Sequence, residues 1–278
     1  MRGMTLGQFY PADSVLHRMD PRFKIICSIA YIVASFLCKN FFSFVLLVVS
    51  AVALILLSRI PLRVVLRSVR PLIFIMAFTA VLNIFWVTDA GSEPLFQWRF
   101  IAVYEKGLYQ ALFILLRIVA MIIGTSIFLT YTTTPIALTD AIERLLYPLS
   151  RLHVPVHTFA MMMTIALRFI PTIVDETDKI MSAQKARGAD FTTGSLVSRA
   201  KALIPVIVPL FASAFRRADE LATAMECRCY HGGEGRTRLR VLKCHARDFL
   251  TLLAVAVLIA GIAVINAEGA VNGWIYTM

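Results

Sequence analysis

The feature that most constrains this chain is an almost continuous apolar run over residues 23–57, interrupted in its middle by Lys39-Asn40. A single helix of that length would extend about 52 Å at 1.5 Å per residue, whereas the hydrocarbon core of a bilayer is only about 30 Å thick. The run therefore predicts two helices joined by a tight turn at Lys39-Asn40. Because the first helix is short for a complete span, a partly re-entrant hairpin is the alternative.

Three further apolar runs cover residues 72–87, 107–131 and 249–265. Hydrophobic residues make up 59% of the 278 residues and charged residues 16%, whereas a soluble domain has about 25% charged residues. This composition excludes a soluble globular protein and a disordered chain. It predicts an all-α integral membrane protein with about five transmembrane helices. The chain divides into four N-terminal spans (1–131), an inner region of long coupling helices (132–247) and a final span with an external tail (248–278).

Basic residues indicate the orientation of these spans. The formal net charge is +11, and sixteen of the 28 Lys and Arg residues lie between residues 132 and 247. The N-terminal 24 residues and segment 59–70 are also rich in Lys and Arg, and cytoplasmic loops carry this excess. The N-terminus is therefore predicted inside and the C-terminus outside. Nucleic-acid binding is not expected, because the basic residues are spread out and not interleaved with exposed aromatic side chains.

The inner region mixes its basic residues with ten acidic ones and with Leu, Ile and Met at helical spacing. Its apolar stretches, 159–173 and 202–215, contain prolines that would bend a helix. We expect long cytoplasmic or interfacial helices that run along or just under the membrane. The alternative is that one or both stretches enter the bilayer. Before them, Thr134-Pro135 marks the start of an amphipathic helix that suits the membrane interface or a partner.

Two arginines between small residues stand out in this region, in Ala186-Arg187-Gly188 and in Cys227-Arg228-Cys229. Each ends a long predicted helix, and Gly188 and Gly232 can adopt the left-handed conformation that ends helices. One interpretation is a capped helix end with a solvated arginine. The other is docking, because small neighbours let another protein approach and a guanidinium can bind a carboxylate through two hydrogen bonds. Since the pattern occurs twice, 41 residues apart, it predicts two equivalent docking sites for two copies, or two homologues, of a partner.

Motifs for catalysis or metal binding are weak in this chain. It lacks the GxxxxGK[ST] loop of P-loop ATPases and the HExxH zinc motif. A competing metal site would use Cys227, Cys229, His231, Cys244 and His245. Side chains two residues apart on a helix point about 200° apart, so these groups converge only on an irregular backbone. Free thiols at a helix end are therefore the favoured interpretation, and no metal is expected.

Two further features lie in apolar segments. Arg117 lies in the run 107–131, where a charge is normally paired or functional; the sequence names no partner for it. Met161, Met162 and Met163 suit either ordinary helix packing or a surface that accepts different membrane partners, because methionine is flexible and polarisable.

Eight short motifs, taken in their order and spacing, resemble the transmembrane T component of energy-coupling factor (ECF) transporters, which are ABC-type importers. They are residues 5–11 (TLGQFYP), 20–24 (DPRFK), 133–135 (TTP), 166–171 (ALRFIP), 176–180 (ETDKI), 186–190 (ARGAD), 216–222 (RRADELA) and 232–238 (GGEGRTR). The resemblance covers nearly the whole chain. It implies a scaffold in a bacterial or archaeal cell membrane that joins a substrate-binding membrane S component to two cytoplasmic ATP-binding ATPases.

The resemblance also implies roles for single residues. Arg187 and Arg228 would each dock in a groove of one ATPase, at the ends of two coupling helices. Cys227 and Cys229 stand where the family has Ala and Gly, which leaves open the backbone geometry at the second motif. Contact with the S component is the role considered for the three consecutive methionines.

The function implied is that of a non-catalytic coupling subunit, embedded in the lipid bilayer, for uptake of vitamins or other micronutrients. This chain would hold no cofactor, because its partners bind the ATP. The N-terminal residues 5–14 look more like T components shared by several S components, which favours vitamins, and a dedicated cobalt or nickel system is the alternative. From other classes, a stand-alone membrane enzyme and a secondary transporter are the rivals.

Overall fold

The computed structural model describes residues 9–86, 96–98, 101–152, 154–191, 193, 195–232 and 244–272. The chain forms two compact units. The first, called the bundle below, comprises Gly7–Leu138 and Leu242–Met278; the second, the long-helix unit, comprises Met1–Leu6 and Thr139–Val241. Most of the motif at 5–11 and nearly all of the motif at 232–238 lie outside the described residues.

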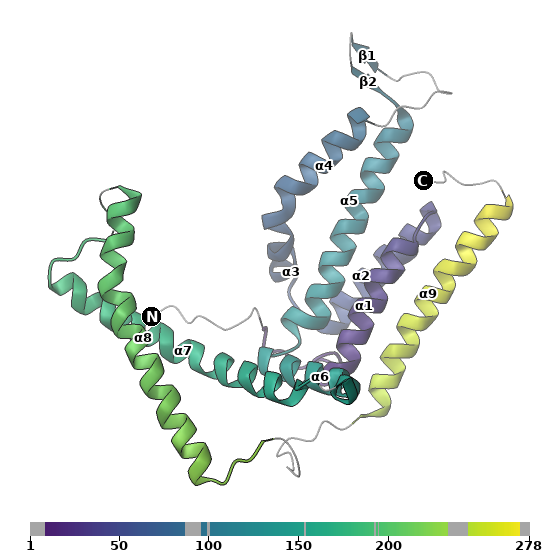
Figure 1. The fold of residues 1–278 in the computed structure, drawn as a ribbon. Coiled ribbons are helices and arrows are strands. Elements are labelled where there is room, and N and C mark those ends of the chain that lie inside the picture. The colour runs from purple at the N-terminus through teal and green to yellow at the C-terminus, as the bar shows by residue number, and fades with distance from the viewer. Residues whose placement is uncertain are drawn as a thin grey trace. The chain divides into compact units, whose positions relative to one another are not determined.

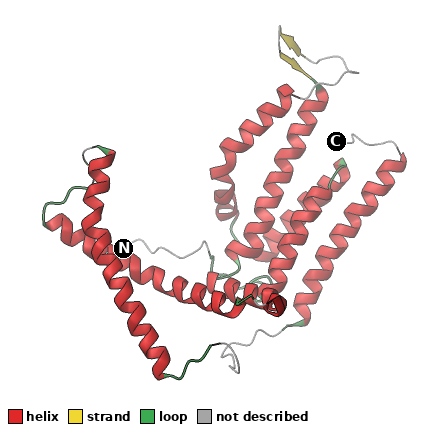
Figure 2. Ribbon diagram, viewed as in Figure 1, coloured by secondary structure: helices red, strands yellow, loops and turns green. Residues whose placement is uncertain are grey.

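Helices account for almost all of the described secondary structure (Figure 2). A short antiparallel hairpin, which the sequence analysis did not predict, joins β1 (Phe96–Trp98) to β2 (Ile101–Val103). Within the described residues, six helical segments are long and apolar enough to cross a membrane: Phe41–Ser58, Leu62–Phe85, Gly107–Tyr131, Val156–Ala186, Val197–Cys227 and Ala246–Ala267. The predicted all-α membrane class is therefore confirmed.

The six candidates differ in two respects from the five predicted spans. α1 (Pro21–Leu37), the short first helix of the predicted hairpin, is not among them because it has only 17 residues. α7 (Val156–Ala186) and α8 (Leu196–Cys227) are among them, because each runs unbroken through its internal prolines for 31 and 32 residues. Length and composition alone qualify these two helices, so their course along the membrane stays a prediction.

The bundle contains the two helices predicted from the run 23–57, since α1 is followed by a turn and then by α2 (Phe41–Ser58). Asp20 starts α1 as its N-cap, where its carboxylate accepts a hydrogen bond from the backbone N–H of Arg22 at 3.0 Å. The remaining bundle helices are α3 (Leu62–Val69), η1 (Arg70–Leu72), α4 (Ile73–Trp86), α5 (Glu105–Thr125), the π-helix η2 (Ser126–Tyr131) and α9 (Ala246–Asn272).

Within the bundle, α1 lies between α5 and α9 (Figure 1). Buried polar contacts join the starts of these helices. Lys24 Nζ donates a hydrogen bond to the carbonyl oxygen of Thr132 at 2.7 Å, and the Asp248 carboxylate accepts one from Asp20 N at 3.0 Å. Because burying such groups without partners would be costly, these contacts hold the start of α1 to the segment that follows η2 and to the start of α9.

Arg117 of α5 has partners that the sequence did not identify. Its Nη2 donates to the carbonyl oxygen of Cys38 at 2.8 Å, and the guanidinium carbon lies 5.4 Å from the ring centroid of Phe44. Cys38 is the C-cap of α1, so the positive charge meets a carbonyl at the negative end of that helix. Arg117 therefore has a structural role, in which it holds the end of α1 against α5.

The long-helix unit contains most of α6 (Pro135–Leu146), η3 (Tyr147–Leu152), α7 and α8. α6 starts at the predicted residues, and Thr134 Oγ1 accepts a hydrogen bond from Ala137 N at 3.3 Å. In this unit α7 and α8 cross and contact each other (Figure 1). The crossing joins the two helices that carry the arginine motifs.

Candidate docking helix ends

α7 ends in a Schellman motif around its C-cap residue, Arg187. Gly188 N donates to Lys185 O at 3.0 Å, and Ala189 N donates to Gln184 O at 3.0 Å. These two bonds satisfy carbonyls that the end of a helix otherwise leaves without donors. Gly188 has φ +89°, the left-handed conformation that this reversal requires and that glycine adopts without steric penalty.

α8 ends in the same hydrogen-bond pattern around its C-cap residue, Arg228. Cys229 N donates to Glu226 O at 2.9 Å, and Tyr230 N donates to Met225 O at 3.1 Å. The two arginines therefore occupy equivalent positions, each one residue before a left-handed residue. The backbone geometry at the second motif, which the sequence left open, is that of the first.

The left-handed residue after α8 is Cys229, with φ +54°, and not Gly232. Gly232 also has a positive φ of +99°, but it lies beyond the capping bonds, which end at Tyr230. The prediction that Gly232 ends this helix is therefore wrong. Local sequence favours glycine at such a site, yet here the helix has already ended three residues earlier. Cysteine occupies the position at a cost of roughly 1–2 kcal/mol, because its β-carbon is crowded by the backbone in this conformation.

A partly buried ion pair joins α7 and α8 where they cross. The Glu176 carboxylate of α7 accepts hydrogen bonds from Ser213 Oγ and from Arg217 Nη2 of α8, each at 2.5 Å. The Arg217 and Glu176 side chains are 35% and 23% exposed, so water screens the pair only in part. This one carboxylate therefore binds two side chains one turn apart on the opposite helix.

A second contact uses a carbonyl that a proline leaves free. Pro209 has no N–H, so the carbonyl oxygen of Pro205, one turn earlier, lacks its helical donor. Gln184 Nε2 donates to this oxygen at 3.3 Å, close to the Arg187 end of α7. From Pro205 to Arg228, α8 extends about 34 Å at 1.5 Å per residue. The two arginines therefore lie at well-separated points of the unit.

Both docking candidates are accessible. Arg187 and Arg228 are exposed, as are the small residues that flank them: Ala186, Gly188, Cys227 and Cys229. In the described part of the chain, neither guanidinium has a hydrogen-bond or ion-pair partner. Each helix end therefore presents an exposed positive charge to solvent.

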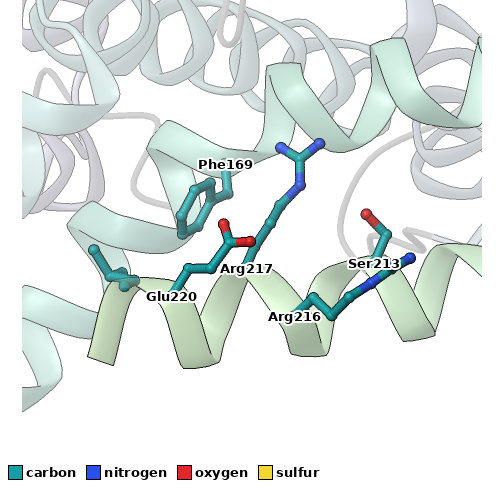
Figure 3. A pocket seen from close by; sticks show the side chains of 6 residues that line it. Phe169, Ser213, Arg216, Arg217 and Glu220 are labelled. Atoms are coloured by element: carbon teal, nitrogen blue, oxygen red, sulfur yellow. The ribbon is translucent and has the colours of Figure 1, made fainter. Parts of the chain in front are cut away.

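An open groove of about 590 Å³ lies beside the crossing (Figure 3). Its lining residues are Phe169 of α7 and Ser213, Arg216, Arg217, Glu220 and Leu221 of α8. In Figure 3, Phe169 lies close to Arg217 and Glu220. The groove carries charges of both signs, and Arg217 is engaged by Glu176. The motif at 216–222 therefore contributes to the α7–α8 contact, away from the two helix ends.

The methionine run lies near the start of α7. Met161 is half-buried, whereas Met162 and Met163 are 54% and 40% exposed. Exposed apolar side chains continue on the neighbouring elements, at Ile142, Leu146, Tyr147, Leu149 and Leu152. Together they form an apolar surface on α6, η3 and α7 of the kind that lipid or another protein covers.

The sequence did not predict several polar contacts of this unit. Glu176 and Gln184 are examples, and Glu143 is another: it is buried on α6 and accepts a hydrogen bond from His157 Nδ1 of α7 at 2.9 Å. An acidic residue is almost never fully buried without a partner, but the neighbouring Asp140 and Arg144 make this part of α6 look solvent-exposed in the sequence. The partner could not be read from sequence, because it depends on which helix packs alongside.

The described residues do not form the alternative metal site. Within the described residues, which include all five cysteines, no group of three or more His, Cys, Asp or Glu side chains could hold a metal ion. Cys27 and Cys38 are buried, whereas Cys227, Cys229 and Cys244 are exposed, and all five are free thiols. The two thiols beside Arg228 are therefore free and accessible to solvent.

Comparison with known proteins assigns this arrangement to a family. A profile of the family described as "Cobalt transport protein" (CbiQ) matches residues 12–239, which include both helix ends. The chain belongs to the CbiQ family. Several relatives are named "Energy-coupling factor transporter transmembrane protein EcfT". The one from Clostridium kluyveri is 52% identical over 93% of this chain and 95% of its own length, and the one from Ruminiclostridium cellulolyticum is 50% identical over 90% of this chain and 92% of its own length. The one from Bacillus subtilis is 46% identical over 94% of this chain and 97% of its own length.

Membership of the CbiQ family confirms the resemblance seen in the sequence. This CbiQ-family chain is the transmembrane component of an energy-coupling factor transporter and a multi-pass membrane protein. The two arginine helix ends therefore belong to a transport protein.

Proposed function

We propose that this chain is the non-catalytic scaffold that links two cytoplasmic ATPases to a membrane-embedded, substrate-binding S component. The observation that carries the proposal is the pair of equivalent helix ends. Arg187 and Arg228 follow the same capping geometry, are exposed, and have no partner among the described residues. The ATPases bind the ATP, and this chain contributes no cofactor.

Docking at each end would be a charge-assisted hydrogen bond between the guanidinium and a carboxylate of one ATPase. The small flanking residues let the helix end enter a groove without steric conflict. Removal from water strengthens such a pair, and breaking a desolvated charge pair costs about 2–5 kcal/mol. Two ends of equal geometry suit two ATPases that are identical or homologous.

Motion of the ATPases would reach the S component through α7 and α8. ATP binding closes the ATPase pair and moves the docked ends. The contacts of Glu176 with Ser213 and Arg217, and of Gln184 with Pro205, oppose sliding of one helix past the other. The crossing therefore converts movement at its ends into movement of the whole pair.

The apolar surface that includes Met162 and Met163 is the part of the long-helix unit that we assign to the S component. These side chains are exposed, and unbranched, polarisable methionines adapt to partners of different shape. Met161, the first of the three methionines, is half-buried. In this role the S component selects the cargo, for which vitamins are our first candidate.

A dedicated cobalt or nickel system is the second candidate, because the matching family is described as a cobalt transport protein. The relatives' names mention no cargo. Uptake of labelled vitamins and of cobalt or nickel by cells that express the complete transporter distinguishes the two. Uptake by this chain alone, without ATP, would contradict the coupling role.

We further propose that the N-terminus lies inside and the C-terminus outside a bacterial or archaeal cell membrane, because the basic segments collect on one side. A cysteine introduced at position 275, which lies outside the described residues, should react with an impermeant maleimide from the outside. Labelling from the inside only would contradict this orientation.

The docking role is tested by copurification of the ATPases with charge-reversal variants. Arg187→Glu and Arg228→Glu should each lower the number of ATPases recovered per chain, and the double variant should abolish both ATPase recovery and uptake. Lys201→Glu is the matched control, since Lys201 is an exposed basic residue near the start of α8, away from its end and outside the groove. Normal assembly and uptake in the double variant would refute the assignment.

A further inference from the structure

The two docking ends have the same backbone but different chemistry. Ala186 and Gly188 flank the first arginine, whereas Cys227 and Cys229 flank the second. Both of these cysteines are exposed free thiols. The first end thus carries no reactive side chain next to its arginine, and the second carries two.

Cys229 occupies its position against a conformational preference. Among the described residues, Cys229 and Arg59 are the non-glycine residues with positive φ. Gly188 makes the same Schellman bonds without this strain, so the helix end does not require a side chain there. Strained residues concentrate at positions where the side chain has a function. The thiol itself is therefore the feature that needs an explanation.

We propose that Cys227 and Cys229 form a thiol-modification site that prevents docking of one ATPase at Arg228 and leaves docking at Arg187 unaffected. The inference rests on the proposed docking function. The reactant is a low-molecular-weight disulfide, and its adduct adds bulk where the docking geometry has room only for a small residue. Oxidising conditions would in this way uncouple one of the two ATPases.

The chemical step is thiol–disulfide exchange. A cysteine loses its proton to solvent, and the resulting thiolate attacks one sulfur of the external disulfide. A new S–S bond forms, the original S–S bond breaks, and the other half of the disulfide leaves as a thiolate with the electron pair. The cysteine is thereby oxidised to a mixed disulfide, the leaving half is reduced to a thiol, and an added thiol reverses the reaction.

An internal disulfide between the two cysteines is not the product that the geometry favours. Cys227 is the last residue of α8, and Cys229 lies two residues later in the left-handed cap. The structure holds both cysteines as exposed free thiols and not as a disulfide, which would need β-carbons about 3.5–4.5 Å apart. Each thiol therefore faces solvent and reacts separately.

The test uses the purified full-length chain with Cys244→Ser, which removes the other exposed thiol and leaves Cys27 and Cys38, both buried. The probe is 5,5′-dithiobis(2-nitrobenzoate), removed before the two ATPases are added so that their own cysteines do not react. Two equivalents of coloured thiolate should be released per chain. ATPases recovered per chain should fall from two to one, and dithiothreitol should restore the second.

The matched control carries Cys227→Ala and Cys229→Gly, which gives the second end the Ala-Arg-Gly sequence of the first. This variant should bind two ATPases before and after treatment. Equal inhibition of the control, or full ATPase binding by the modified chain, would overturn the inference while leaving the docking function intact. Full ATPase binding by the untreated Arg228→Glu variant would instead refute docking at this end.

Discussion

Replacing Gly188 with alanine should destabilise the capped helix end at Arg187, the first proposed docking site, without causing a steric clash. Gly188 has φ +89°, and a β-carbon at this position would meet no atom within 4 Å. The substitution therefore introduces backbone strain alone, roughly 1–2 kcal/mol for an L residue in the left-handed region. The lower entropy of alanine in the unfolded chain offsets about 0.4–1 kcal/mol of this strain. The expected net loss is about 1 kcal/mol.

The assay is hydrogen exchange of the two capping amides. The amides of residues 188 and 189 donate to the carbonyls of Lys185 and Gln184, so they exchange when the cap opens. A loss of about 1 kcal/mol makes this opening about fivefold more frequent, and both amides should exchange about fivefold faster. Affinity for an ATPase at this end should fall by no more than the same factor.

Gly261→Ala in α9 is the control for this prediction. A β-carbon at Gly261 would lie 3.5 Å from Leu46 Cδ2, an ordinary contact, and its φ is not in the positive range. Alanine is a better helix former than glycine, so this variant should leave the capping amides unchanged and the fold no less stable. Unchanged exchange at residues 188 and 189 in Gly188→Ala would refute the argument that the left-handed conformation holds the cap together.

Three other changes test the contacts described above. Glu176→Gln should lower stability by about 1 kcal/mol, measured by thermal unfolding in detergent; a double-mutant cycle with Arg217→Ala that shows no coupling would contradict the ion pair. Arg117→Met should cost about 1–3 kcal/mol, because the Cys38 carbonyl loses its donor, and Arg117→Lys should cost less; equal losses would argue against that hydrogen bond. Burial lowers the pKa of His17 from its ordinary value of 6.5, so protonation opposes folding, and stability should be complete above pH 6.5 and fall below it. His17→Asn should flatten this acid limb of the melting temperature plotted against pH, and an unchanged limb would exclude His17 as its source.

Helix boundaries that depend on a few neighbouring residues could be predicted from the sequence. The break at Lys39-Asn40 separates two helices, as expected because a single helix over the whole run would be longer than the hydrocarbon core of a membrane is thick. Thr134 starts α6 because its hydroxyl supplies the acceptor that a first turn lacks. Both arginine motifs end their helices for an equally local reason, namely a left-handed residue directly after the arginine.

Local sequence was a poorer guide where more than one nearby residue could end a helix. Gly232 looked like the residue that ends α8, but the hydrogen bonds place that role on Cys229. The prolines in α7 and α8 predicted bends in these helices; both helices continue through them, and the carbonyl freed by Pro209 is used by Gln184. A proline removes one hydrogen bond, and a donor from another helix can replace it.

The sequence by itself determined the membrane class, the helical fold, the family and the location of two arginines at helix ends. These properties depend on apolar runs and on capping interactions that span at most six consecutive residues. Only the tertiary structure decided that Arg117 holds the end of α1 and that Glu176 binds two residues of α8. It also gave the second helix end the backbone of the first. Such contacts join residues that are distant in the chain, so they exist only once the helices have packed.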